Sequence, residues 1–342
     1  MPVRKPEEPL DGREQNYIWN FSAPHRLPEM RGKLATWLSE RGADFYLESL
    51  IVGSQQIRPP GPLSQSATRL AEQEHHRVTE GELFWVSADM TELARHAGRR
   101  LTRHELFEHD LPDRCGFMVF ETPLADSCVD GLRLEIVAVS WGLIEPPLLV
   151  TEGSREVPVG SRWATGVGVW FTFYSDPNGF LEANLQNLTE VRLVWRRQTG
   201  PFLPDNELVW ALNQPEDLPE EEDVTSAWGR TVVAAWLLMQ QPLASHGTER
   251  ALRPARRRLT KAGLPTDDVR LVRVRRPEPR ATDSRPGAGR EYSVRWWVEG
   301  HWRRYRCGPG RERVERRWIS PYLAGPGDKP VQGAQRVKIW DR

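Results

Sequence analysis

The stretch GVGVWFTFYS at residues 166–175 is the strongest strand signal in this sequence and the best guide to its fold class. Val167, Val169, Phe171 and Phe173 recur at a period of two, which places their side chains on one face of a β-strand. We therefore predict that this strand lies in a sheet and that these four side chains share a face.

On either side of this strand, apolar patterning predicts further strands and several helices. Strands are predicted at 82–87, 116–121, 132–141, 191–196 and 269–274. Helices are predicted at 29–41, 43–53, 64–77, 88–98 and 248–263, and one more begins at Thr225 or Ser226 and stops before Pro242. Because helices come first and several strands with short links follow, the order favours an α+β fold over a doubly wound parallel sheet.

Charge is strongly divided along the chain, although its net value is zero. Residues 1–223 hold 21 Lys and Arg against 36 Asp and Glu, a net charge of −15. Residues 224–342 hold 26 against 11, a net charge of +15. Such asymmetry indicates a polyanionic partner for the basic part. The alternative is that the acidic and basic parts dock on each other.

Composition places a candidate linker at this charge boundary and predicts six segments. Residues 1–28 are a flexible tail, 29–212 an acidic α+β body of mixed helices and strands, and 213–224 an acidic linker. Residues 225–276 form a helical connector with a basic cluster, 277–289 a second linker, and 290–342 a small basic β-rich module. We expect the acidic body to provide a surface for a protein partner.

The segment 290–318 is the most informative for function, because it holds nine Arg, four Trp and two Tyr against four Glu. Arg binds phosphate in a bidentate manner, and exposed aromatic rings stack on unpaired bases. Alternation between 292 and 299 puts Trp296 on an apolar face and Trp297 on a polar one. The predicted nucleic-acid-binding residues here are Arg295, Trp297, Trp302, Arg303, Arg304, Tyr305, Arg306, Arg311, Arg313, Arg316 and Arg317. The alternative is that the Trp side chains form the core of a small module that the Arg side chains shield.

Two further patterns in the basic part allow more than one interpretation. Arg256, Arg257, Arg258 and Lys261 fall in the predicted helix 248–263, where they could follow a phosphate backbone or form a solvated helix face. His301, Arg304 and Tyr305 are candidate catalytic residues of a metal-independent ribonuclease, because such residue types move protons and hold a charged transition state. Their spacing is not diagnostic, so the sequence leaves open whether the protein is an enzyme.

Other features bound the class of protein. The three cysteines include no CxxC pair, which is typical of reduced thiols in a cytoplasmic protein. The longest apolar run, at 232–239, is too short to span a bilayer, so no membrane association is expected. The histidines have no metal-ligand spacing, and phosphate-binding and nucleophile motifs are missing, so we expect no metal and no cofactor.

Several stretches carry a resemblance to a known family. They are AWGRTVVAAWLLMQQPL at 227–243, VRLVRVRRP at 269–277, VEGHWRRYRCGPGRERVERRWISPYLAGPGDKP at 298–330, ELFWVSADMTELA at 82–94, and the pair AVSWG and VWFTFY. Together they resemble an uncharacterised protein family of actinobacteria, their phages and mobile elements, which has a Gly-His-Trp-Arg … Trp-Ile-x-Pro-Tyr … Gly-Pro pattern near its C-terminus. The resemblance implies a mobile-element or phage-conflict setting.

The leading hypothesis for function is nucleic-acid binding in such a system, with DNA or RNA undecided, through the basic region 225–342. One alternative is a metal-independent ribonuclease-like toxin or effector. The other is a non-enzymatic protein-interaction module whose acidic and basic halves are docked.

Overall fold

The structure is a computed structural model, and it describes residues 21–52, 57–58, 62–101, 103–129, 132–144, 151–152, 168–177, 202–213, 215–217, 224–275 and 294–324. The predicted strand at 191–196 and the predicted linker at 277–289 lie outside these ranges.

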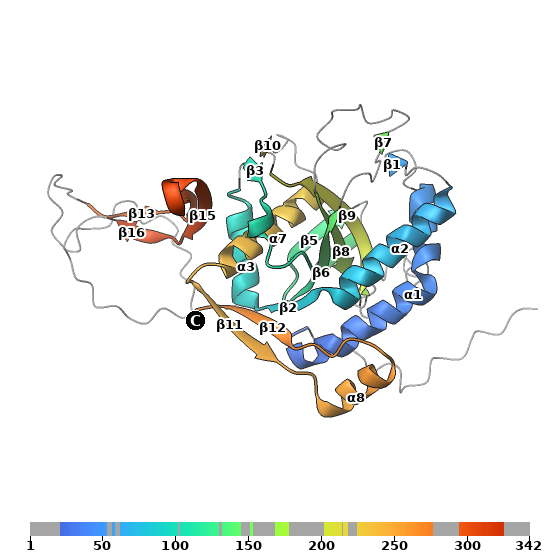
Figure 1. The fold of residues 1–342 in the computed structure, drawn as a ribbon. Coiled ribbons are helices and arrows are strands. Elements are labelled where there is room, and N and C mark those ends of the chain that lie inside the picture. Colours follow the sequence, from blue (N-terminus) through green and yellow to red (C-terminus); the bar gives the residue numbers. More distant parts are fainter. Residues whose placement is uncertain are drawn as a thin grey trace, which may run out of the picture.

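Eight of the described strands form one mixed sheet at the centre of the molecule (Figure 1). They are β2 (Glu82–Val86), β4 (Cys115–Phe120), β5 (Ala125–Val129), β6 (Leu132–Ile144), β8 (Gly168–Ser175), β9 (Leu203–Ala211), β11 (Ala244–Glu249) and β12 (Val269–Val274). Their order is β11-β12-β2-β4-β6-β8-β9, with β5 paired to β6. β12, β2 and β4 are parallel, and the other neighbouring strands are antiparallel.

Helices cover both faces of this sheet. α1 (Leu27–Val52) and α2 (Leu63–Glu80) lie on one face, and α3 (Ala88–Gly98) and α7 (Val224–Met239) lie on the other (Figure 1). α8 (Arg253–Lys261) packs beside α1. Alternate residues of a strand pack against the helices on opposite faces of the sheet. Leu83 and Trp85 of β2 pack toward α1 and α2, whereas Phe84 and Val86 pack toward α3 and α7. The predicted α+β class is confirmed.

Strand β8 is buried on both faces, which explains why apolar residues predominate along its whole length. Val169, Phe171 and Phe173 share the face toward α7, as the period of two predicts. The alternate side chains face α1 and α2, where Tyr174 is fully buried. Val167, the fourth member of the predicted face, lies outside the described residues.

Shorter elements complete the described chain. The one-turn helices are η1 (Pro24–Arg26), η2 (Glu108–Asp110) and η3 (Pro309–Arg311). Four antiparallel strand pairs lie outside the central sheet: β1 (Ile57–Arg58) with β7 (Thr151–Glu152), β3 (Arg103–Glu105) with β10 (Pro215–Asp217), β13 (Trp296–Val298) with β16 (Tyr322–Ala324), and β14 (His301–Cys307) with β15 (Arg313–Ile319).

One predicted helix limit is wrong. The helix predicted at 29–41 and continued from 43 is α1 (Leu27–Val52), in which Gly42 lies against α2, where an added Cβ would lie 3.0 Å from Ala71 Cβ. The helix predicted at 248–263 begins only at Arg253. Thr248 and Glu249 instead pair with β12, and Pro254 suits the first turn of α8.

The predicted segments also differ from the structure at three places. Residues 21–28 are packed rather than a flexible tail, since Phe21 is buried and its carbonyl accepts the Trp85 indole N–H at 2.7 Å. Residues 215–217 of the acidic linker form β10. The predicted connector 225–276 is part of the body, because β12 lies inside the central sheet and twelve of the sixteen α7 residues are buried. A helix that is apolar on all sides has to be enclosed, and the charge tally did not reveal this.

A buried carboxylate ties α2 to the sheet. Glu74 is 0% exposed. Its oxygens accept hydrogen bonds from the Arg77 guanidinium, from Ser140 Oγ at 2.5 Å, from Thr172 Oγ1 at 2.9 Å and from the Tyr174 hydroxyl. Burial, with the nearby Glu74 charge, raises the pKa of Tyr174 well above its usual value, so the hydroxyl remains a donor. A buried charge is tolerated only when it is paired and hydrogen-bonded, as here.

We predict that Glu74→Ala lowers the free energy of unfolding by about 3–5 kcal/mol, because it leaves the buried Arg77 and three hydroxyl donors without their acceptor. Urea denaturation followed by circular dichroism measures this change. Glu72→Ala, on the exposed side of α2, is the matched control and should change stability by less than about 0.5 kcal/mol. A loss below about 1 kcal/mol for Glu74→Ala would contradict the assigned role.

We predict that a second carboxylate makes the stability of the protein depend on pH. Burial raises the pKa of Asp205 in β9 from 3.8 to about 6, and its Oδ2 has no hydrogen-bond partner among the described residues. Between these pH values Asp205 ionises in the unfolded chain before it ionises in the folded protein, so stability falls as pH rises from about 4 to about 6.

Asp205→Asn should remove this penalty and raise the free energy of unfolding by up to about 3 kcal/mol over wild type at pH 7, but by little at pH 4. Urea denaturation at both pH values measures the change. An equal gain at both pH values would contradict this cause.

Candidate nucleic-acid interface

Strands β14 and β15 form a hairpin that carries most of the predicted nucleic-acid-binding residues. Trp302 pairs with Trp318, Arg303 with Arg317, and Tyr305 with Glu315. Because directly opposed residues of an antiparallel pair point to the same side, the hairpin has two chemically different faces. The inner face holds Trp302, Arg304, Arg306, Val314, Arg316 and Trp318, and the outer face holds His301, Arg303, Tyr305, Cys307, Arg313, Glu315, Arg317 and Ile319.

The inner face is anchored to α3 and α7 by two tryptophans. Trp318 is 4% exposed and belongs to the core between the sheet and these helices. The Trp302 ring lies edge-on to it with centroids 5.3 Å apart, and its indole N–H donates to the Ala97 carbonyl at 2.8 Å. The Trp318 backbone N–H donates to Gln241 Oε1 at 2.9 Å. An added Cβ at Gly300 would lie 2.3 Å from the Trp318 ring, so the approach requires glycine.

A buried ion pair completes this anchor. Arg316 donates to Asp110 Oδ2 at 2.8 Å, and the two side chains are 8% and 7% exposed. His96 of α3 lies edge-on to Trp318 at 5.8 Å. Burial, together with two nearby arginines, lowers the pKa of His96, so at pH 7 it adds no cation to the contact. Trp302 and Arg316 are therefore engaged inside the protein and are not available to a nucleic acid.

The outer face presents cations around one ring. Arg303 and Arg317 are exposed, and their guanidinium carbons lie 5.1 and 5.3 Å from the centroid of the Tyr305 ring. This is within the range of a cation–π contact, which orients both groups. Glu315 accepts from Arg317 at 3.1 Å, and hydrogen bonds from Cys307 and Arg317 lower the pKa of this carboxyl. The outer face therefore carries more positive than negative charge, and Glu315 is the carboxylate that lies among its arginines.

The turn between the strands adds cations at the hairpin tip. Arg311 is exposed and has φ of 57°, between Gly310 at 66° and the start of β15. Arg306 and Arg313 flank the turn and are exposed as well. The turn thus leaves Arg311 open to solvent.

The remaining predicted residues near the hairpin have varied surroundings. Arg295 is partly buried. The Trp297 side chain lies outside the described residues. Arg304 is exposed but belongs to the inner face, opposite Arg316.

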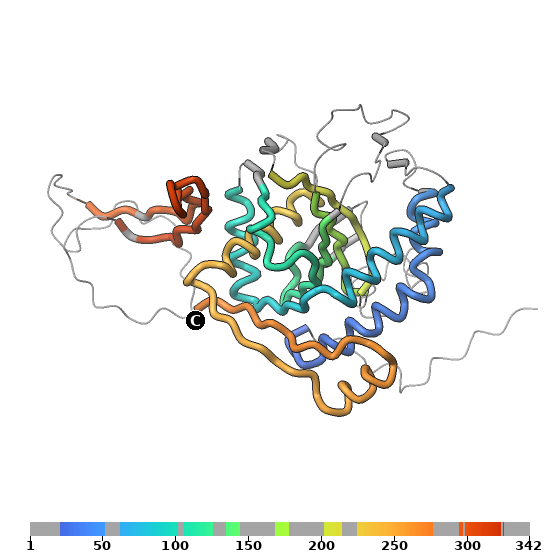
Figure 2. The backbone as a smooth tube through the Cα atoms, viewed as in Figure 1, coloured from blue at the N-terminus to red at the C-terminus, as the bar shows by residue number. Residues whose placement is uncertain are grey.

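The α8 cluster lies at the other end of the body from the hairpin (Figure 2). Arg258 donates to Glu29 of α1 at 2.8 Å, and Arg256 is partly buried, so these two side chains help to hold α8 in place. Arg257 and Lys261 are exposed. The structure therefore does not bring the two predicted basic clusters onto one surface.

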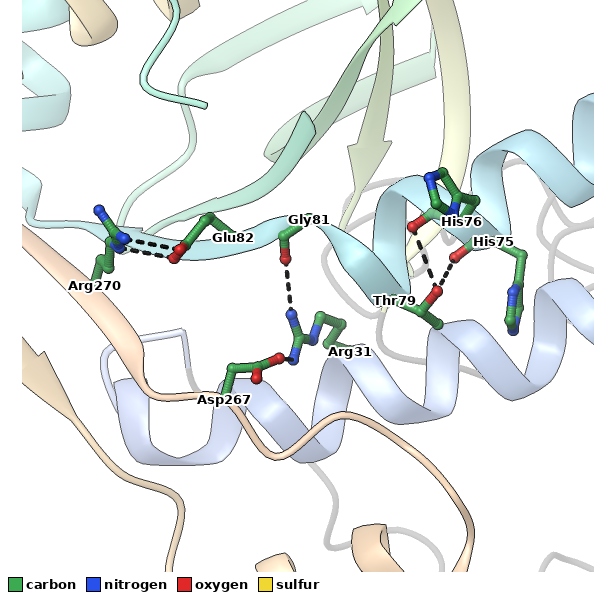
Figure 3. Close-up of polar contacts among 8 residues, drawn as sticks. All are labelled: Arg31, His75, His76, Thr79, Gly81, Glu82, Asp267 and Arg270. Carbon is green, nitrogen blue, oxygen red and sulfur yellow. Dashed lines mark hydrogen bonds and ion pairs between the residues drawn. The ribbon is translucent and has the colours of Figure 1, made fainter. Parts of the chain in front are cut away.

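A groove of about 1240 Å³ opens between α1, α2 and the loop before β12. Its lining includes the carboxylates Glu40, Glu80, Glu82, Asp267 and Asp268. Figure 3 shows Arg270 facing Glu82, and Arg31 bridging the Gly81 carbonyl at 3.1 Å and Asp267 at 2.9 Å. The acidic lining of the groove disfavours the phosphates of a nucleic acid. The pair of Arg31 with Asp267 joins the loop to α1, and the pair of Arg270 with Glu82 joins β12 to β2. We call this groove the acidic groove.

The candidate catalytic residues are not assembled into one site. Tyr305 and His301 belong to the outer face, whereas Arg304 belongs to the inner face. His301 Nδ1 lies 3.1 Å from the Glu299 carbonyl. Within the described ranges no group of three His, Cys, Asp or Glu side chains is placed to hold a metal ion. None of the helices described here has the length and apolarity of a membrane-spanning segment.

Comparison with known proteins gives the family. The sequence model of the AcrVA2-like family, described as the anti-CRISPR type V subtype A2 family, matches residues 84–326. This chain belongs to the AcrVA2-like family. Membership agrees with the phage-conflict setting that the resemblance implied, and the matched range includes both α7 and the hairpin.

Structural comparison adds little to this membership. The crystal structure of AcrVA2 aligns with 87% of this chain and 93% of its own, at 10% identity and a TM-score of 0.36. A search of curated proteins found no match.

We predict that Trp318→Ala lowers the free energy of unfolding by about 3–5 kcal/mol and exposes the hairpin to limited proteolysis, because it empties the contact with α3 and α7. Urea denaturation and mass spectrometry of tryptic fragments measure both effects. Tyr322→Ala, 47% exposed in β16, is the control and should change stability by less than about 0.5 kcal/mol. Wild-type resistance of the Trp318→Ala hairpin would show that the anchor lies elsewhere.

Proposed function

We propose that this AcrVA2-like protein is an anti-CRISPR protein that acts on a type V CRISPR effector and contacts the nucleic acid of that complex through the outer face of the hairpin. Family membership supports the target. The observation that carries the contact is the set of exposed arginines on the outer face and tip: Arg303, Arg306, Arg311, Arg313 and Arg317. Exposed cations gain affinity for a polyanion by releasing its counterions.

The anchor supports this assignment, because it leaves the arginines available. Docking of the basic hairpin on the acidic body was the alternative to nucleic-acid binding in the sequence. In the structure the docking uses Trp302, Trp318 and Arg316, whereas Arg303 and Arg317 point to the other side. Docking and nucleic-acid contact are therefore compatible. The acidic groove has the opposite charge and would suit a basic protein surface of the same complex.

The ribonuclease alternative is less well supported. It needs a proton-transfer residue and a charge-stabilising residue around one reacting phosphate. Arg304 belongs to the opposite face of the hairpin from Tyr305 and His301, so these three residues do not converge.

We predict that expression of the wild-type protein restores phage plaquing on a host protected by a type V CRISPR system. The triple variant Arg303→Gln, Arg313→Gln, Arg317→Gln should lose this effect, because it removes three exposed charges from the proposed contact. The efficiency of plaquing measures both, with protein levels checked by immunoblot.

Arg257→Gln with Lys261→Gln is the matched control, since it removes exposed charges from α8 at the far end of the body. This control should retain the wild-type effect. Plaquing that stays low with wild-type protein present would refute the anti-CRISPR assignment. Plaquing at the wild-type level with the triple variant would refute the role of the hairpin.

A further inference from the structure

We propose that the outer face grips the phosphate backbone of nucleic acid and does not stack on bases, with Tyr305 serving as a platform that orients Arg303 and Arg317. This inference rests on the proposed function and narrows its ligand to the sugar–phosphate chain. It changes the role that the sequence suggested for Tyr305, from a stacking partner of bases to a positioning residue for guanidinium groups.

The Tyr305 ring is already in contact with two cations. Both guanidinium carbons lie within 5.3 Å of the Tyr305 centroid. Arg303 and Arg317 are directly opposed in the register, so they reach the ring from adjacent strands of the same face. A base that stacked on this ring would have to compete with these cation–π contacts, whereas a phosphate can bind the guanidinium edges while the contacts remain.

The charge of these two groups favours a bound anion. Two guanidinium groups on one ring repel each other, and a bound anion relieves that repulsion. The Glu315 carboxylate neutralises part of this repulsion through its bond of 3.1 Å to Arg317. Arg303 and Arg317 thus present two guanidinium groups on one face of the hairpin, and each guanidinium can bind a phosphate in a bidentate manner.

The tryptophans of the hairpin strands point away from the outer face. Trp302 and Trp318, the two tryptophans of the hairpin strands, are directed into the contact with α3 and α7. Tyr322 in the neighbouring β16 is 47% exposed and is a ring that could still stack, so it is tested separately.

The test compares a fluorescently labelled single strand with an abasic strand of equal length, which keeps every phosphate but has no bases. Fluorescence anisotropy with the full-length protein gives the dissociation constants. If the outer face binds only the phosphate backbone, the dissociation constants for the normal and the abasic strand agree within about threefold. Stacking is worth about 1–3 kcal/mol per base, so it predicts at least about fivefold weaker binding of the abasic strand.

Variants separate the platform from the cations. Arg303→Gln with Arg317→Gln should reduce the slope of log affinity against log salt by about 1.4, because each phosphate contact on a single strand contributes about 0.7. Glu315→Gln should strengthen binding by about two- to fivefold, since it removes a competing surface carboxylate. Tyr305→Leu should weaken binding of both strands equally, and Tyr305→Phe should restore it. Tyr322→Ala should leave binding unchanged.

The outcomes distinguish the proposed nucleic-acid contact from the proposed binding of its phosphate backbone. If the wild-type protein binds neither strand at low salt, the proposed nucleic-acid contact fails, and this inference fails with it. If it binds the normal strand but loses the abasic one, or if Tyr305→Leu weakens only the normal strand, the backbone grip is overturned while nucleic-acid contact stands. An unchanged melting temperature of the arginine variants excludes unfolding as the cause.

Discussion

Helix α7 has to be covered on every side, and much of the structure follows from this. Its central run of Val, Ala, Trp, Leu and Met is apolar around the circumference, and twelve of its sixteen residues are buried. The central sheet covers one side, where the Phe171 and Trp236 rings stack at 5.3 Å, and α3 packs alongside. Trp318 of β15 joins the same core. The C-terminal hairpin is therefore held to the body by the core itself.

This attachment determines what the hairpin can present to a partner. Once Trp302 and Trp318 point inward, strand alternation sends Arg303, Tyr305 and Arg317 outward together. The buried pair of Arg316 with Asp110 stabilises the same orientation. The acidic groove and the α8 cations lie away from this surface (Figure 1).

Much of the fold was predictable, because buried strands and amphipathic helices leave periodic patterns in the sequence. The limits of α3 and β12 and the shared face of β8 follow from such patterns. The candidate site was predictable only as a basic, aromatic segment. Alternation along β14 would have separated Trp302 from Arg303 and Tyr305, but the choice of the buried face needed its partners. Ala97, Asp110 and Gln241 lie far from the hairpin in sequence and carry no local signal.

By itself the sequence determined the α+β class, the main strands and the concentration of arginine near the C-terminus. Those properties are local, since they depend on residue spacing and composition. Only the tertiary structure decided that residues 224–275 belong to the body, that the two basic clusters lie apart, and which arginines face outward. Each of these depends on contacts between segments distant in the chain, such as Glu74 with Thr172 and Arg316 with Asp110. The net charge of a half-chain contains no information about such contacts.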